Sequence, residues 1–447
     1  MEPESGRKRK RRRTSSAHSG TFATQIELED RDRKIAVYLR VLRSFFLFFA
    51  YIATLIYIMS IPLEKAIVVD DVGSVSRAIG IPLLGLWVIV LVFNPFYRRI
   101  NSFFIVAACF VMWVGLTRFW AESVETVDFF LVTYVQLLLS SLCIWLALDQ
   151  ESKCKTALQV FLIGAWVVIF VIFYNFHTGN LEGNRATIAS SDQNEIALML
   201  AMCLSVAMFL ATNRSGRSRP NFIIKLVNLV FVPCALMAII MTGSRGGTLA
   251  AVPALMFLLF NFGKANIGTK SILGLMIVIG AVVLVQNLPE EQFDRIASTQ
   301  EEIESGDISG RGDLWSDAYE FWAADVETMI GGIGSGNFID VTQTLVHNTH
   351  LSVLTETGLV GFSIYLFMLL ILFFAIRRSG DGHVKAFLYS FLLSWFVGAT
   401  ALTWEYRKPT WLAWSLIICI AVAFRKKPIR KQPASSGNKR RRRKVQS

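Results

Sequence analysis

Cysteine is scarce in this chain, and the few residues present follow no disulfide or metal pattern. Of the 447 residues, six are cysteines, five of which lie inside apolar runs, while Cys154 lies in a short basic loop. No two of them have CxxC spacing, so the sequence indicates neither a disulfide framework nor a zinc site. We also expect no cleavable signal peptide, because the first apolar run begins far from the start and is too long for an h-region.

Charged residues are scarce as well. Only 17% of the residues are charged, whereas 53% are hydrophobic, and the mean hydropathy is +0.49. Soluble domains rarely have so apolar a composition, and runs long enough to span a bilayer recur along the whole chain. These runs are continuous rather than alternating, which favours helices over a β-barrel. The sequence therefore predicts an all-α polytopic membrane protein.

We expect about 12 transmembrane helices, with a long, partly helical periplasmic loop between spans 9 and 10. The predicted spans are 43–62, 76–94, 102–117, 128–148, 156–176, 194–212, 223–242, 247–263, 269–287, 350–376, 384–402 and 409–424. The predicted domains are a disordered basic cytoplasmic tail (1–42), spans 1–9 (43–287), the periplasmic loop (288–348), spans 10–12 (349–424) and a second basic cytoplasmic tail (425–447).

Helical spacing recurs inside the long loop. Leu314, Trp315, Ala318, Tyr319 and Trp322 repeat at intervals of three to four residues. This pattern predicts an amphipathic helix at the membrane interface, with its aromatic side chains at the depth of the lipid headgroups.

Lysine and arginine set the predicted orientation. They gather in both tails and in the connections after spans 2, 4, 6, 8 and 10, which places both termini in the cytoplasm. The net charge of +12 lies mainly in the tails. We interpret these basic runs as topology signals that also contact anionic lipids, and we expect no nucleic-acid partner because the apolar body offers no platform for one.

Among the few arginines on the opposite, outer side, where cations are disfavoured, three stand out. Arg185 precedes span 6, Arg245 lies in a tight Gly-Ser-Arg-Gly-Gly turn, and Arg311 begins the amphipathic helix. Each could reach a lipid phosphate or cap a helix carbonyl. A binding site for phosphate is the functional alternative, because the planar guanidinium matches phosphate oxygens two at a time.

The stretch 340–362 places further polar groups at the mouth of span 10. Asn348 or Thr349 is the candidate helix cap, and His347 lies just outside the helix, where a histidine of near-neutral pKa can take a proton from a hydroxyl. His350 is a second candidate for that role or for binding substrate. Glu356, about two turns further in, must face the bundle interior. The spacing of these residues does not favour a metal site, and we expect none.

Two acidic residues and a glycine-rich turn complete the predicted outer site. Asp192 and Glu195, near the start of span 6, are candidates for binding sugar hydroxyls or orienting Arg185, or simply for complementing a helix N-terminus. The turn at 331–336 has neither the preceding strand nor the Lys-Ser/Thr of a nucleotide loop. We interpret it as a turn that lets the backbone approach a ligand.

Taken in order, these motifs resemble the O-antigen ligase and O-antigen polymerase superfamily of integral membrane glycosyltransferases. The motifs that carry the resemblance are the Arg185 segment before Ser191-Asp192-Gln193-Asn194-Glu195, Gly243-Ser244-Arg245-Gly246-Gly247, Gly310-Arg311 with Leu314-Trp315, Gly332-Ile333-Gly334-Ser335-Gly336-Asn337-Phe338, and His347-Asn348 with Leu351, Glu356, Gly358 and Gly361.

This resemblance implies a bacterial inner-membrane enzyme whose donor is a glycan linked through diphosphate to undecaprenol. It implies that Arg185 and Arg245, joined by Arg311, hold the diphosphate, and that His347 acts as base on an acceptor sugar hydroxyl. No cofactor, metal or nucleotide sugar is required. The adjacent His350 leaves the choice of base open.

A ligase and a polymerase share this chemistry and differ in the acceptor. A ligase uses lipid A-core or another surface acceptor, whereas a polymerase uses a second lipid-linked repeat unit. The His347-Asn348 pair at the end of the loop favours the ligase description. A membrane transporter is a third alternative, but it would favour an internal repeat and ionisable residues near the midplane, whereas here the charges lie at one surface.

Overall fold

The computed structural model is predominantly helical over the residues it describes, which are 15–64, 66, 68–69, 73–94, 97–182, 185–188, 191–212, 222–262 and 311–425, with isolated positions between 263 and 310. The helices are α1 (Ser15–Ser60), α2 (Val75–Phe93), α3 (Ser102–Leu116), α4 (Val124–Ala147), α5 (Glu151–Thr178), α6 (Gln193–Thr212), α7 (Phe222–Met241), α8 (Arg245–Phe262), α12 (Gly312–Ala323), α13 (Val326–Gly331), α14 (Asn337–Thr342), α15 (Thr349–Arg377), α16 (Gly382–Ala399) and α17 (Lys408–Ala423). Two short antiparallel hairpins pair β1 (Val68–Val69) with β2 (Gly73–Ser74), and β3 (Leu181–Glu182) with β4 (Arg185–Ala186).

Within this described part, eight helices are long and apolar enough to cross a membrane. The apolar segments of α8 and α17 are shorter. The predicted class, an all-α polytopic membrane protein, is confirmed. The predicted span over 269–287 and the loop residues 288–310 lie outside the described residues, apart from isolated positions, so the count of 12 spans stays a prediction.

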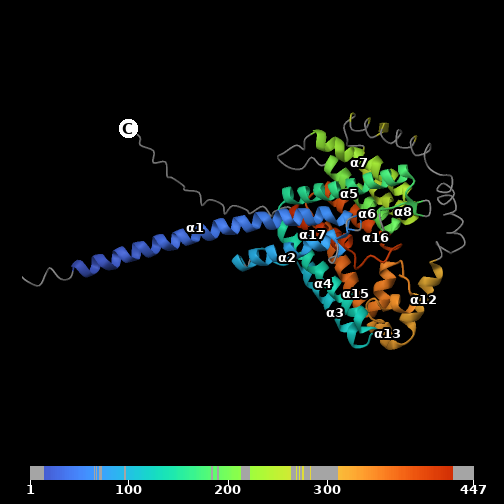
Figure 1. Ribbon diagram of the computed structural model, residues 1–447, viewed down its shortest axis with the longest axis horizontal. Helices are drawn as coiled ribbons and strands as arrows, with labels where there is room; N and C mark the ends of the chain where they lie inside the picture. Colours follow the sequence, from blue (N-terminus) through green and yellow to red (C-terminus); the bar gives the residue numbers. More distant parts are fainter. Residues whose placement is uncertain are drawn as a thin grey trace, which may run out of the picture.

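The first helix is longer than the sequence analysis predicted. α1 begins at Ser15 and runs to Ser60, so the segment predicted to be disordered is helical from Ser15 onward. In Figure 1 this helix projects well beyond one end of the bundle. The segment from 21 to 60 contains neither proline nor glycine, so no helix-breaking residue separates the apolar span from the polar segment before it.

α6 forms the centre of the bundle, among α5, α7, α8 and α16 (Figure 1). Every residue from Ile196 to Phe209 is buried, as expected for a helix that is apolar on all sides. Small residues allow its neighbours to approach closely, because a Cβ at Gly247 of α8 would collide with Ala197 and one at Gly398 of α16 would collide with Leu198. The start of α8 therefore lies directly against the start of α6.

α15 is broken near its beginning. Gly358 has φ 64° and ψ −172°, a conformation that is essentially restricted to glycine. The break exposes backbone carbonyls, and the glycine-rich turn satisfies them: Ile333 N–H donates to the Thr355 carbonyl and Gly334 N–H to the Glu356 carbonyl, each at 3.0 Å. The turn predicted to approach a ligand thus approaches the backbone of α15.

The amphipathic helix predicted in the long loop is confirmed as α12. Its apolar side is turned partly onto the protein, since Trp315 Nε1 donates to the Val346 carbonyl at 3.1 Å and Ala318 packs with Phe338 and Val346. Tyr319 stays exposed. Together with α13, α12 lies at the end of the bundle opposite to the projecting part of α1 (Figure 1).

Candidate active site

The Arg185 side chain, from β4, lies against the turn that precedes α8. Its Nε donates to the Thr242 carbonyl at 2.6 Å, and its Nη2 donates to Asn194 Oδ1 at 3.3 Å. Gly243 allows this approach, because it has φ +60° and a Cβ there would lie 3.3 Å from Arg185 Nε. A side chain from the β3–β4 hairpin is thus fixed against the beginnings of both α6 and α8.

Arg245 is the first residue of α8 and is half-buried. The turn before it is held by Ser244, whose hydroxyl donates to Asn194 Oδ1 at 2.8 Å and accepts from Gly247 N–H at 3.1 Å. Asn194 therefore joins the Arg185 side chain to the turn that carries Arg245. Arg185 and the turn before Arg245, about 60 positions apart in the chain, thus both contact Asn194.

Arg311 joins this region through the connection between α16 and α17. Its Nη1 donates to the Ala401 carbonyl at 2.8 Å, and the Ala401 side chain lies against Gly246 of the same turn as Arg245. Burial lowers the pKa of the Arg311 guanidinium, and the nearby charge of Asp192 opposes that shift. The guanidinium is therefore partly desolvated, which strengthens its interaction with an anion.

His347 faces the same charged groups. Burial lowers the pKa of its imidazole below the ordinary 6.5, Arg311 lowers it further, and Asp192 and Glu195 oppose the shift. A lowered pKa keeps the ring neutral at pH 7, the state in which it can accept a proton. Its Nδ1 is buried and has no hydrogen-bond partner among the described residues.

The backbone of His347 is unusual for a residue with a side chain. Its φ of 52° lies in the left-handed region, and its N–H donates to Thr403 Oγ1 at 2.8 Å. Conformations of this kind are found at functional sites more often than elsewhere. The loop between α16 and α17 therefore sets the position of this histidine.

His350 points elsewhere. Its Nδ1 is 2.8 Å from the Tyr365 hydroxyl, and its ring packs against Phe396 with the ring centroids 4.6 Å apart. The two candidate bases thus have different surroundings: His347 lies among charged groups, and His350 lies among aromatic side chains of the bundle. This geometry favours His347 as the base.

Two other candidates hold backbone groups. The Asn348 side chain accepts from the N–H groups of His350 and Leu351 and caps α15, as expected. Glu356 is buried as expected, and its Oε2 accepts from Gly336 N–H at 2.8 Å. Glu356 is therefore placed to hold the glycine-rich turn against α15.

The acidic pair at the start of α6 has two different sets of contacts. Asp192 Oδ1 accepts from Asn194 N–H at 2.8 Å, which complements the start of the helix. Glu195 pairs with Arg407 Nη2 at 3.0 Å. That these carboxylates orient Arg185 stays a prediction, and the Arg185 guanidinium is held by Asn194 and the Thr242 carbonyl.

The loop of residues 400–407, between α16 and α17, contacts most of these groups, and it was not predicted from the sequence. Besides the contacts of Ala401, Thr403 and Arg407, its Leu402 carbonyl accepts from Thr349 Oγ1 at 2.6 Å, and Glu405 Oε1 accepts from Ser352 Oγ at 2.8 Å. Burial raises the pKa of the Glu405 carboxyl to about 7. Adjacent cations at 407 and 408 on the outer side were the available signal, of the same kind that singled out Arg185.

The arrangement combines a neutral imidazole with several cations at the start of α6 and α8. Such a site can bind an anionic group and remove a proton from a neighbouring hydroxyl. Among the described residues no group of three or more His, Cys, Asp or Glu side chains is suited to hold a metal ion.

Comparison with known proteins gives a family match for part of the chain. Residues 229–366 match the family model described as O-antigen ligase, a range that includes Arg245, Arg311 and His347 but neither Arg185 nor the 400–407 loop. No curated protein and no solved structure matches the chain.

The resemblance predicted from the sequence is thereby confirmed, and the match supports assignment to the O-antigen ligase family. Together with the apolar helices, it indicates a bacterial membrane protein of polysaccharide biosynthesis, with a glycosyltransferase-like activity on lipid-linked glycans.

Proposed function

We propose that this chain, as a member of the O-antigen ligase family, moves a glycan from an undecaprenyl-diphosphate carrier to an acceptor sugar hydroxyl on the periplasmic side of the inner membrane. One observation carries the proposal. Arg311 and the backbone of His347 are both bound to the 400–407 loop, and the turn that carries Arg245 and binds Arg185 packs against the same loop. The stretches that carry Arg185, Arg245, Arg311 and His347 thus gather around the 400–407 loop.

Arg185, Arg245 and Arg311 are proposed to hold the diphosphate of the donor. The planar guanidinium group pairs with phosphate oxygens through parallel N–H bonds and stays charged at all physiological pH values. The first turns of α6 and α8 lie side by side here, because Gly247 packs against Ala197. Their positive helix ends add to the attraction for the anion.

His347 is proposed to take the proton of the acceptor hydroxyl as its oxygen attacks the anomeric carbon. A new C–O bond forms to the acceptor while the bond from the anomeric carbon to the diphosphate oxygen breaks. The electron pair leaves with the polyprenyl diphosphate, and the arginines stabilise its growing charge. Attack from the face opposite the leaving group inverts the anomeric centre.

The ligase description and the polymerase alternative both use this site and differ only in the acceptor. Purified protein, given a lipid-linked oligosaccharide with and without a lipid A-core acceptor, distinguishes them. A single transfer that needs the core acceptor identifies a ligase. A ladder of repeat units formed without it identifies a polymerase.

The same assay tests the site. Replacement of Arg185, Arg245 or His347 by alanine should lower the transfer rate about 100-fold or more, the usual cost of losing a group that stabilises a transition state. Arg118→Ala is the matched control, because the ion pair of Arg118 among the described residues is an exposed one, with Asp128 at 2.9 Å. Near-normal transfer by Arg245→Ala, with the protein folded, would rule out the proposed clamp.

A further inference from the structure

A groove separate from the His347 region lies between α2 and α4. Its cavity has a volume of about 430 Å³, within the range of ligand-binding pockets. It begins at Arg77 and Lys408, at the same end of the bundle as the 400–407 loop, and continues along the two helices to Leu84 and Ser140. At a rise of about 1.5 Å per residue, the groove extends roughly 10 Å along α2 and roughly 16 Å along α4.

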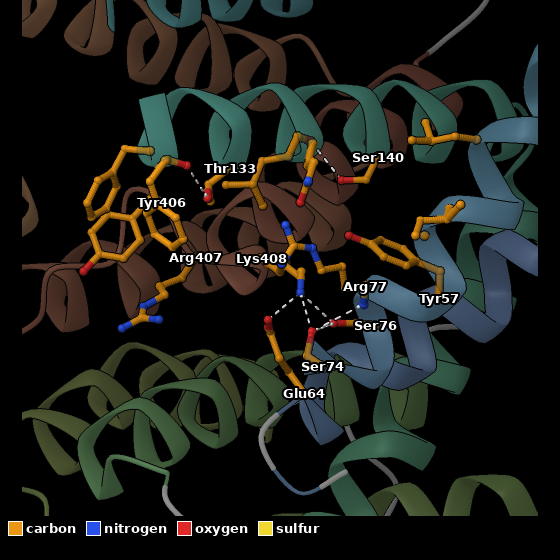
Figure 2. A pocket seen from close by; sticks show the side chains of 17 residues that line it. Tyr57, Glu64, Ser74, Ser76, Arg77, Thr133, Ser140, Tyr406, Arg407 and Lys408 are labelled. Carbon is orange, nitrogen blue, oxygen red and sulfur yellow. Dashed lines mark hydrogen bonds and ion pairs between the residues drawn. The ribbon is translucent and has the colours of Figure 1, made fainter. Parts of the chain in front are cut away.

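The mouth of the groove is cationic. Lys408 Nζ is held by Glu64 and by the hydroxyls of Ser74 (2.9 Å) and Ser76 (2.8 Å), as Figure 2 shows. Arg77 is exposed, and its guanidinium has no hydrogen-bond or ion-pair partner among the described residues. Among the described residues, the mouth is lined by the cations Arg77, Arg407 and Lys408 and by the carboxylate Glu64, and Arg407 also pairs with Glu195. This excess of cations is complementary to an anionic headgroup.

The walls below the mouth are mainly apolar. Ile81 and Leu84 come from α2, and Phe129, Phe130 and Leu137 come from α4. The hydroxyls of α4 in the groove, on Thr133 and Ser140, donate to carbonyls of their own helix. Ile81 is 65% exposed, so the groove is open along its α2 side. A cationic mouth above an apolar groove between two helices fits a phosphate-headed lipid with one long hydrocarbon chain.

Arg407 stands between the groove and the candidate active site. It lines the groove, while its Nη2 pairs with Glu195, one of the charged groups that act on His347. In Figure 2 its guanidinium points away from Lys408. A lipid in the groove would therefore place its headgroup next to the charged cluster of His347, on the other side of Arg407.

We propose that the α2–α4 groove is a second lipid-phosphate site, which takes a single-chain polyprenyl phosphate lipid and holds the lipid-anchored acceptor beside His347. The site itself is inferred from the groove alone, and its role in holding the acceptor rests on the proposed function. A single groove between two helices suits one isoprenoid chain better than the several acyl chains of lipid A, so this inference favours the polymerase alternative.

Two substitutions test the groove without disturbing the fold. Arg77 is the third residue of α2, where glutamate is a favoured partner of a serine N-cap, so Arg77→Glu reverses the charge at little cost in stability. Ile81→Trp fills the groove. The control is Val88→Trp, on the same helix and 60% exposed, which lies outside the groove lining.

The probe is undecaprenyl phosphate, bound to the full-length protein in nanodiscs and counted by native mass spectrometry. We expect two lipids on the wild type and on Val88→Trp, and only one, with at least tenfold weaker binding of the second, on Arg77→Glu and Ile81→Trp. Two bound lipids on the groove variants would overturn the site. Equal displacement of the probe by phosphatidylglycerol would overturn it too, because the groove would then hold bulk phospholipid.

A transfer assay separates this inference from the proposed function. The groove variants should need about tenfold more acceptor for half-maximal rate, with an unchanged dependence on the donor. If they transfer normally while Arg245→Ala is inactive, the second site fails and the proposed function stands. If Arg245→Ala transfers normally but the groove variants lose the second lipid, the lipid site stands and the proposed function fails.

Discussion

A hydrogen bond across 56 positions of the chain, from His347 N–H to Thr403 Oγ1, holds the candidate base in a left-handed conformation. Its neutral state follows from burial and from Arg311, while Asp192 and Glu195 act in the opposite direction. His350, three residues further on, has aromatic neighbours and Tyr365 as its partner. The sequence favoured His347 as the base but left His350 open as an alternative, and the two histidines have different surroundings.

The charges around His347 predict opposite effects on the pH profile. Arg311→Gln removes a cation that lowers the pKa of His347, so this pKa rises and the acid limb of the transfer rate moves to higher pH. Asp192→Asn removes an anion that raises it, so the limb moves to lower pH, and asparagine still caps α6. Rates measured between about pH 5 and 8 check both shifts, with Arg118→Gln as the control.

Glycines in two stretches fit α15 to the glycine-rich turn. A Cβ at Gly332 would meet the backbone of Glu356, and a Cβ at Gly358 would meet the carbonyl of Ile330. From the sequence we interpreted this turn as one that approaches a ligand, whereas in the structure it packs against another part of the chain. The packed turn then buries Glu356, which holds Gly336 N–H. The glycines and the buried carboxylate of Glu356 therefore hold the turn against the first part of α15, which follows His347.

We predict that Gly358→Ala destabilises the protein strongly, because it combines a positive φ with a collision against Ile330. The expected loss in unfolding free energy is at least about 2 kcal/mol, within the range for strained backbone. Gly382→Ala is the matched control, since a Cβ there meets nothing within 4 Å. Thermal unfolding of the detergent-purified variants checks this. Equal melting temperatures would contradict the role assigned to the break in α15.

The bundle as a whole has two unlike ends. One end holds α12 to α14, the 400–407 loop and the mouth of the α2–α4 groove. The other end includes the α4–α5 connection, near Ser152. α4 runs between the two ends, since the residue before it, Ser123, donates its N–H to Asn337 Oδ1 at 2.8 Å. The positive-inside pattern predicts that the α12–α14 end faces the periplasm.

Cysteine labelling tests that orientation. Glu327→Cys in α13 should react with a membrane-impermeant maleimide in intact spheroplasts, whereas Ser152→Cys should react only after lysis. Both positions are exposed, so access to the reagent depends on the side of the membrane. Reaction of both cysteines from the same side would contradict the predicted topology.

The sequence by itself determined the class of the protein and most of the helices, because membrane spans depend on the length and polarity of local runs. It also determined that Arg185, Arg245, Arg311 and His347 stand out, since cations and a histidine on the outer side of an apolar chain are locally visible.

Only the tertiary structure decided what these residues approach. The 400–407 loop contacts Arg311, His347 and Glu195 through bonds that span large distances in sequence, and no local pattern encodes such pairings. For the same reason, the roles of Glu195, Glu356 and Arg407 became visible only when packing placed a partner beside each of them.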